Sequence, residues 1–166
     1  AVSGSYRDAQ GFDHPYVRDP NGHFIDVQIP GMMGGNGGGI NIAGTAVGNY
    51  VNLTDDNSMF VHYHGYVRSP AGAVMSFDPP NSVSTDIPNA ALNDFGAITG
   101  DYWVCAVDFS SCTVHGFVRS ANGAVTTFDV PGAGADGYSG QGTYPQGINN
   151  AGAITGFYVD ENNVTH

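Results

Sequence analysis

Two histidines in the sequence each precede an aspartate by 14 residues. A histidine hydrogen bonded to an aspartate is part of the catalytic triad of many hydrolases. His64 is followed by Asp78, and His115 is followed by Asp129. A short glycine-containing turn between them would fold each segment into a hairpin and place each histidine opposite its aspartate, as in a catalytic triad. The pair recurs at equal positions, however, whereas an active site needs one special copy. We therefore expect a structural bond between strands in both places.

The cationic residues are few and spread along the chain. Lys and Arg together number 4, all of them arginines, against 15 Asp and Glu, which gives a net charge of −11. Clustered cations provide most of the affinity for phosphate backbones, so this composition argues against nucleic acid and anionic membrane surfaces as partners. The repeating Arg18, Arg68 and Arg119 are expected to be structural ties between repeats. No stretch reaches 18 uninterrupted apolar residues, so we expect no membrane insertion.

Two regions offer metal-ligating atoms. His62 and His64 are two residues apart and would share one face of a strand, beside a loop that contains Asp55 and Asp56. Residues 55–57 and 160–163 offer oxygen ligands for calcium, but both lack the spacing and the bracing glutamate of a calcium-binding loop. We predict no metal site and no cofactor, and calcium is the alternative at these loops.

A third group combines aromatic rings with polar side chains. An aromatic ring offers a flat apolar face on which a sugar can stack, and nearby acceptors can bind the sugar hydroxyls. These residues are therefore our candidates for ligand binding, and the alternative is that the rings cap the ends of strands. The set consists of His62, Tyr63, Tyr102, Trp103, Asp108, Phe109, Tyr138 and Tyr144.

The two cysteines, Cys105 and Cys112, are seven residues apart, which is the wrong spacing for a zinc or redox pair. A local disulfide is the favoured interpretation, and it indicates an oxidising, extracellular setting. The first residues, AVSGSYRD, lack the basic start and apolar centre of a signal peptide, so the chain is interpreted as soluble or already processed.

A repeat of about fifty residues must position these side chains. Segments 14–31, 64–81 and 115–132 align without a gap, and a second motif precedes each copy at 1–6, 40–50, 92–102 and 148–158. We therefore divide a single domain, 1–166, into repeats 1–39, 40–91 and 92–147 and a partial repeat 148–166.

Each complete repeat is predicted to contain four antiparallel strands. The first begins at Ile40, Leu92 or Ile148 and is followed by a turn that ends in a glycine with positive φ. The glycine-rich segment 34–39 is interpreted as a linker. The connections that vary in length all fall on one edge, where function is usually placed. With 25 Gly and 9 Pro, the chain has too many helix breakers for a helical bundle.

The repeat pattern G-I-N-x-x-G-x-I-x-G-x-Y, H-G-F-V-R and F-D-x-P-G resembles the tandem repeats, often called HAF-type, of secreted bacterial proteins that look like β-propellers. Pro15, Gln28 and Pro79 depart from this pattern. The resemblance implies an all-β fold of about three tandem four-stranded β-meander repeats arranged as β-propeller-like blades. A β-trefoil or a β-prism is the alternative, because these folds also use twelve strands.

We expect a non-enzymatic, extracellular, structural module that assembles with itself. The pattern contains three first strands but four second strands, so the terminal strands are expected to pair with another chain and form a ring or a filament. The alternative for these ends is a longer parent chain. A glycan-binding, lectin-like module is the second functional hypothesis. A propeller-type hydrolase acting on glycosides, with carboxylates such as Asp101 or Asp108, is the third.

Overall fold

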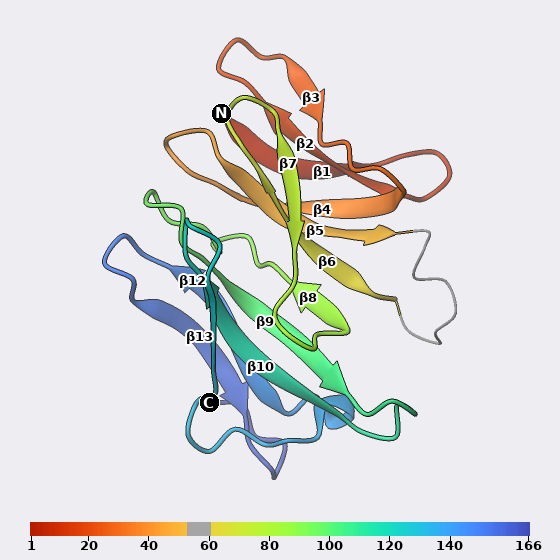
Figure 1. Cartoon of the computed structure of the whole chain (residues 1–166), viewed down its shortest axis with the longest axis vertical. Helices are drawn as coiled ribbons and strands as arrows, with labels where there is room; N and C mark the ends of the chain where they lie inside the picture. Colours follow the sequence, from red (N-terminus) through yellow and green to blue (C-terminus); the bar gives the residue numbers. More distant parts are fainter. Residues whose placement is uncertain (53–60) are drawn as a thin grey trace.

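The computed structural model describes residues 1–52 and 61–166, which form four antiparallel sheets (Figure 1). The predicted all-β fold is confirmed. Sheet A contains β1 (Val2–Arg7), β2 (Asp13–Arg18) and β3 (Phe24–Asp26). Sheet B contains β4 (Met32–Ile40), β5 (Ala46–Asn52), β6 (Tyr63–Arg68) and β7 (Val74–Phe77). Sheet C contains β8 (Ser84–Asp86), β9 (Ile98–Cys105), β10 (Cys112–Arg119) and β11 (Val125–Phe128). Sheet D contains β12 (Gly142–Ile148) and β13 (Ile154–Val159), and a 3-10 turn, η2 (Gly137–Ser139), precedes it.

The strands of each sheet follow one another in chain order, as a meander requires. Sheets B and C have the four strands expected of a complete repeat. The turns that join first to second strands contain Gly44, Gly96 and Gly152, whose φ angles of +86°, +81° and +80° confirm the predicted turn geometry.

The first strands begin earlier than the sequence suggested. The segment 34–39 is the body of β4, so its interpretation as a linker is wrong, and the repeat boundaries at 39/40 and 147/148 fall inside β4 and β12. The glycines are needed because the backbone of β4 lies very close to β1 on one side and to β5 on the other. A Cβ atom at Gly37 would lie 2.5 Å from the carbonyl oxygen of Gly4, and one at Gly35 would lie 2.7 Å from that of Asn49.

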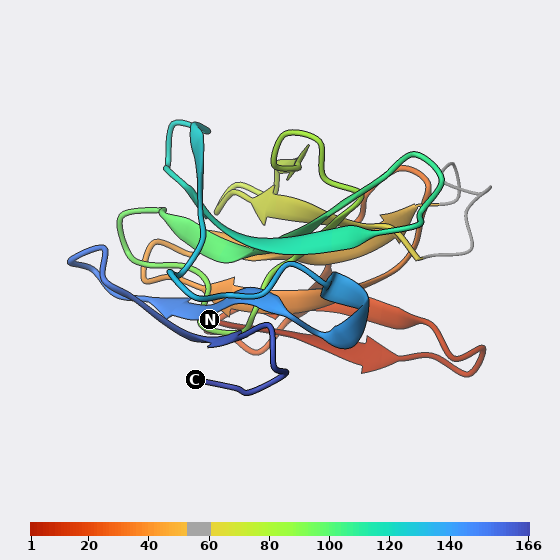
Figure 2. The ribbon, with the colours of Figure 1, turned by 90° about the horizontal axis from the view of Figure 1, so that it is seen from below.

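The four sheets pack against one another in chain order. β1 and β2 contact β4, β6 contacts β8, and β9 and β10 contact β12. The core therefore lies between sheets, and its largest cluster joins Val47 of sheet B to Ile98 and Phe117 of sheet C. The sheets succeed one another along the long axis in Figure 1, which places the N-terminus near the top and the C-terminus near the bottom. Figure 2 shows the same sheets from below.

Asparagine side chains connect the turns at one edge of this row of sheets. The side-chain amide of Asn41 donates to the carbonyl oxygen of Asn93 at 3.2 Å, and that of Asn93 donates to the carbonyl oxygen of Asn149 at 3.0 Å. The Oδ1 atom of Asn93 also accepts from the backbone N–H groups of Phe95 and Ala97. Each asparagine thus shapes its own turn, and Asn41 and Asn93 also bind the next turn. We call this series the asparagine ladder.

The opposite edge carries the loops that join second to third strands. Loop 8–12 lies at the upper right of Figure 1 and loop 106–111 and the η2 turn lie at the lower right, while turns 41–45, 93–97 and 149–153 lie at the left. The predicted short turns between first and second strands are present in sheets B and D, at 41–45 and 149–153. Sheet C differs, because β8 ends at Asp86 and the connection 87–97 to β9 is longer than the 106–111 loop.

Candidate functional site

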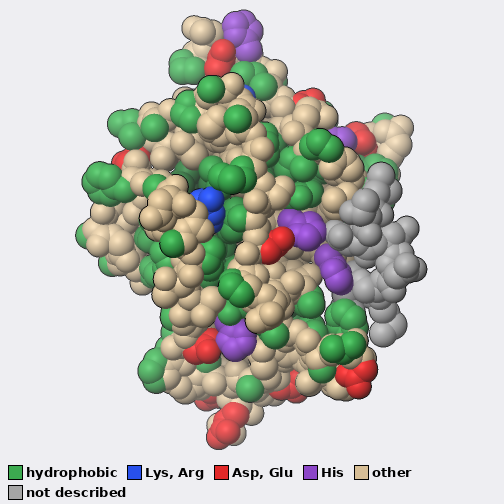
Figure 3. Space-filling view, viewed as in Figure 1, with side chains coloured by type: hydrophobic (Ala, Val, Ile, Leu, Met, Phe, Trp, Pro, Cys, Tyr) green, Lys and Arg blue, Asp and Glu red, His purple; other side chains and the backbone are tan. Residues whose placement is uncertain are grey.

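The surface carries little positive charge, as Figure 3 shows for one face. Arg7 pairs with Asp13 at 2.8 Å, and the guanidinium of Arg18 lies 5.8 Å from the centre of the Phe24 ring. Arg68 and Arg119 are buried, and each donates to the carbonyl oxygen of the next residue at 3.3 Å. The guanidinium carbon of Arg119 also lies 4.8 Å from the centre of the Phe77 ring. Phe77 belongs to β7, so Arg119 connects sheet C to sheet B.

The two histidine–aspartate pairs are hydrogen bonded across neighbouring elements. Nδ1 of His64 lies 2.7 Å from Asp78, and Nδ1 of His115 lies 2.9 Å from Asp129. The second carboxylate oxygen of Asp78 accepts from the hydroxyl of Thr85 on β8, at 2.7 Å. The first pair therefore ties sheet B to sheet C.

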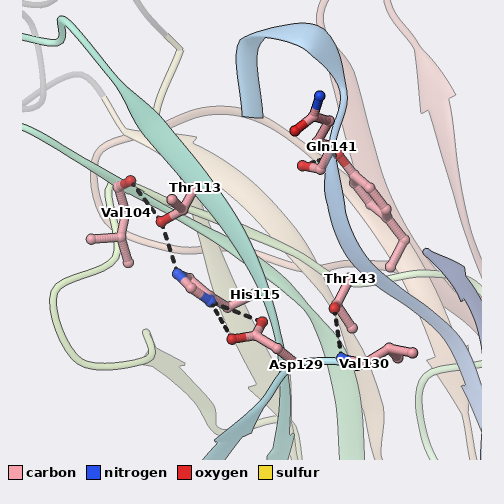
Figure 4. Close-up of polar contacts among 8 residues, drawn as sticks. Val104, Thr113, His115, Asp129, Val130, Gln141 and Thr143 are labelled. Atoms are coloured by element: carbon pink, nitrogen blue, oxygen red, sulfur yellow. Dashed lines mark hydrogen bonds and ion pairs between the residues drawn. The ribbon is translucent and has the colours of Figure 1, made fainter. Parts of the chain in front are cut away.

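In sheet C the hydroxyl of Thr113 lies 2.8 Å from Nε2 of His115, so Asp129, His115 and Thr113 form a line (Figure 4). This order resembles that of a hydrolase triad. The same hydroxyl donates to the carbonyl oxygen of Val104 at 3.4 Å, and none of the three side chains lines the pocket described below.

The remaining repeats contain a similar bond with a different carboxylate. Nε2 of His14 lies 2.8 Å from Asp8, and Nε2 of His166 lies 3.0 Å from Asp160. In both cases the aspartate comes from the preceding turn. A bond that recurs at every repeat histidine supports a structural role.

The clearest concave site lies at the loop edge between sheets B and C. It has a volume of about 310 Å³, and we call it the aromatic pocket. Five of the eight predicted ligand-binding residues line it, although they come from segments far apart in the sequence: His62, Tyr63, Trp103, Phe109 and Tyr138. The other described residues that line it are Val61, Val83, Ser84, Asp86, Cys105 and Cys112.

Loop hydrogen bonds hold the aromatic rings in place. The hydroxyl of Tyr138 donates to the carbonyl oxygen of Phe109 at 2.7 Å, and the Tyr138 ring centre lies 6.5 Å from that of Trp103. Phe109 has a positive φ of 54° and lies 6.4 Å, ring centre to ring centre, from His62, which directly precedes β6 of sheet B. The pocket therefore joins the two sheets through their loops.

The predicted disulfide is present and forms part of the pocket wall. Cys105 and Cys112 are directly opposite each other at the ends of β9 and β10, with Cα atoms 4.0 Å apart. The bond closes the base of the loop that carries Phe109. A disulfide is compatible with an extracellular location.

Three of the predicted ligand-binding residues lie outside the aromatic pocket. Tyr102 is buried in the core, with its ring centre 6.3 Å from that of Phe117. Asp108 is exposed, and its carboxylate accepts from the N–H of Ser110 within its own turn. Tyr144 stacks on Phe157 in sheet D, with ring centres 4.9 Å apart.

Two carboxyl groups that the sequence analysis did not combine meet beside the pocket. Asp86 on β8 and Asp101 on β9 are direct partners in the strand register. Asp86 lines both the aromatic pocket and an adjoining cavity of about 300 Å³, in which Asp101, Tyr144 and Gln146 also lie. One sequence signal could have identified Asp101 as a buried polar residue. It occupies the same repeat position as Asn49, and both lie in largely apolar strands.

Burial controls the protonation of this pair. Asp101 is 6% exposed, and burial, together with the charge of Asp86, raises the pKa of Asp101 to about 8. Burial also raises the pKa of Asp86, but the amide of Asn49, 2.9 Å away, opposes this by donating to the carboxylate. At neutral pH Asp101 is therefore mostly protonated, and the hydrogen bond from Asn49 favours the anionic form of Asp86.

The described residues contain no group of three or more His, Cys, Asp and Glu side chains placed to hold a metal ion. In the loop 160–163, the carboxylate of Asp160 accepts from the N–H groups of Asn162 and Val164 and contacts His166. The other loop considered for calcium, 55–57, lies outside the described residues.

Across residues 1–52 and 61–166, no helix has the length and apolar character that crossing a membrane requires. Comparisons of the chain with protein-family models, with curated proteins and with solved structures found no match.

Proposed function

We propose that this protein is a non-enzymatic, extracellular module that binds a carbohydrate in its aromatic pocket. The observation that carries the proposal is the convergence of five predicted ring-bearing residues on one cavity. They come from β6 and the residue before it, β9, the 106–111 loop and η2. Residues that serve only to cap strand ends have no need to line a common space.

The size and chemistry of the pocket support this proposal. Its volume of about 310 Å³ lies at the lower end of the roughly 300–1,000 Å³ typical of small-ligand sites. The C–H face of a sugar ring can stack on Trp103 or Tyr138, while Ser84 and Asp86 offer hydrogen-bond partners for the hydroxyls. The wall is largely apolar, which suits one or two sugar units.

The hydrolase alternative has less support. Glycosidases generally place two carboxyl groups on opposite sides of the scissile bond. Asp86 is the one carboxyl group among the described residues that line the aromatic pocket, because Asp101 lines the adjoining cavity and Asp108 lies on the loop outside. The line of Thr113, His115 and Asp129 does not reach the pocket.

A glycan array probed with the intact protein tests the proposal. We expect selective binding that Tyr138→Ala or Phe109→Ala reduces about tenfold or more, because each removes a stacking face. Phe95→Ala is the matched control, since Phe95 is 71% exposed on a turn at the opposite edge. The proposal is wrong if the native protein binds no glycan, or if it cleaves the glycans that it binds.

We further propose that the sheets are blades of a β-propeller-like arrangement and that the module associates with itself. Four-stranded meanders that pack against one another in chain order support the propeller-like arrangement.

The exposure of sheet D supports self-association. Phe157 is 38% exposed, whereas Asn49 and Asp101, which hold the same repeat position in sheets B and C, are buried by the next sheet.

Because the inner sheets bury this face against another sheet of the same kind, a second copy of the chain is the proposed occupant. Light scattering of the intact protein should detect oligomers at micromolar concentration. Phe157→Asp should shift the protein towards monomers, and Phe95→Asp, an equally charged change at an exposed turn, should not. A monomeric native protein would contradict self-association and leave the carbohydrate site unaffected.

A further inference from the structure

We infer that the aromatic pocket selects a sugar that carries a protonated amino group over neutral and N-acetylated sugars, because Asp86 offers a carboxylate among aromatic rings. This inference rests on the proposed carbohydrate function and names the class of sugar. It follows from the partners of Asp86, from the rings around it and from the charge of the whole chain.

Among residues 1–52 and 61–166, Asp86 has no cationic partner. Its carboxylate accepts one hydrogen bond, from the amide of Asn49 at 2.9 Å, and it takes part in none of the ion pairs among the described residues. Lys and Arg number four in the entire chain. As described above, all four arginines have contacts elsewhere, with Asp13, Phe24, Ser69, Ser120 and Phe77.

A half-buried carboxylate without a counter-charge favours a cation that arrives with the ligand. Removing a charge from water costs free energy unless an opposite charge or hydrogen bonds replace the lost hydration. Burial raises the pKa of Asp86, which shows that its anionic form is under-compensated. An ammonium group in the pocket would supply a charge-assisted hydrogen bond to this carboxylate.

The rings around Asp86 add a second attraction for a cation. Trp103 and Tyr138 lie 6.5 Å apart, centre to centre, at an angle of 54°, and Phe109 and His62 lie 6.4 Å apart at 47°. All four residues line the pocket, and the face of an aromatic ring attracts an ammonium more than a neutral hydroxyl. An amino sugar can therefore use both stacking and charge, whereas a neutral sugar can use only stacking.

The net charge of the chain acts in the same direction. With a net charge of −11, the protein attracts cationic solutes over distances longer than a contact. A glucose unit carries a hydroxyl in place of the amino group, so it serves as a size-matched neutral comparison. An N-acetylated sugar is also neutral, but its acetyl group adds bulk in a confined pocket.

Trp103 provides a direct readout, because it is the one tryptophan of the chain and lines the pocket. We would titrate the native protein, at slightly acidic pH, with glucosamine trimer, N-acetylglucosamine trimer and a neutral glucose trimer of the same linkage, and follow Trp103 fluorescence. We expect the amino sugar to bind at least about tenfold more tightly than either neutral trimer, and we expect added salt to weaken its binding selectively.

Asp86→Asn tests the role of the carboxylate, because the new side chain keeps the shape and can still accept from Asn49. It should reduce the preference for the amino sugar to about twofold or less, because the ammonium group then has no carboxylate to pair with in the pocket. Asp108→Asn is the control, since it makes the same change in net charge on the loop outside the pocket. Melting curves establish that both variants are folded, and the salt dependence of the native protein provides an independent measure if Asp86→Asn is not.

The outcomes separate this inference from the proposed function. Equal binding of all three trimers, or an unchanged preference in Asp86→Asn, overturns the selection of amino sugars and leaves the carbohydrate function standing. Failure of all three trimers, together with an empty glycan array, overturns both.

Discussion

The side-chain amide of Asn93 donates to the backbone carbonyl oxygen of Asn149, 3.0 Å away in the next turn. Asn41 makes the same bond to Asn93 at 3.2 Å. The asparagine of the G-I-N motif is therefore a connection between successive repeats as well as a turn residue. Since Asn93 is buried, its loss leaves polar backbone groups without partners.

Asn93→Ala should lower the free energy of unfolding by about 2–3 kcal/mol, because it removes two accepted bonds and one donated bond. Asn93→Asp retains the acceptors and loses only the donor, so a smaller loss, of about 1–2 kcal/mol, is expected. Urea denaturation measures both. An unchanged midpoint for Asn93→Ala would contradict a stabilising role for the asparagine ladder.

His115→Ala should lower the stability by about 1–2 kcal/mol, since it removes the bonds to Asp129 and Thr113, and it should leave ligand binding intact. Thermal melting and the glycan titration together provide the test. His23, whose side chain is 75% exposed, offers a control in His23→Ala. Lost function with unchanged melting would instead indicate catalysis by His115.

Asp101 should make the protein less stable as pH rises. Its carboxyl group has a pKa of about 8 in the folded state and about 3.9 when unfolded. Between these values the folded state binds more protons, so the free energy of unfolding falls with increasing pH, by at most about 1.4 kcal/mol per pH unit.

The contribution of Asp101 is complete below about pH 4 and lost as pH passes through 8. Asp101→Asn should flatten this slope and be more stable than the native protein at pH 9, because it removes the buried charge beside Asp86 and Tyr144. Denaturation at pH 5, 7 and 9 provides the measurement. If stability depends on pH equally in the native protein and in Asp101→Asn, then Asp101 is not the group that takes up the proton on folding.

The disulfide should be intact in the native protein, and its removal should affect the pocket. The mass measured without reductant should be 2 Da below that of the reduced chain, as the bond between Cys105 and Cys112 requires. Replacing both cysteines with Ser should cost roughly 2–3 kcal/mol and weaken ligand binding, because the loop bearing Phe109 loses its closure. Two free thiols in the native protein would contradict the bond and weaken the case for secretion.

Features determined within a single repeat could be predicted from the sequence. The positive φ at Gly96 and the pairing of His115 with Asp129 follow from hairpins whose turn length is visible in the repeat. The cysteines are likewise joined across a short loop. In each case the partners are few residues apart, so local turn geometry alone brings them together.

Features determined by packing between sheets could not be predicted in this way. Glycines have low strand propensity, so segment 34–39 was not recognised as part of β4, although close approach to Gly4 and Asn49 requires them there. The pairing of Asp86 with Asp101 depends on the register of β8, which is short and separated from Leu92 by an irregular segment. No repeat motif identified Asp86.

The asparagine ladder also determines how freely the rest of the molecule can change. It connects sheets B, C and D at the turn edge, so we expect their alignment to depend less on the 106–111 loop and η2 at the other edge. Insertions, deletions or grafted sequences in these loops should therefore leave the scaffold intact and alter only what the protein recognises. Such a division would allow new specificities to evolve, or to be engineered, without rebuilding the fold.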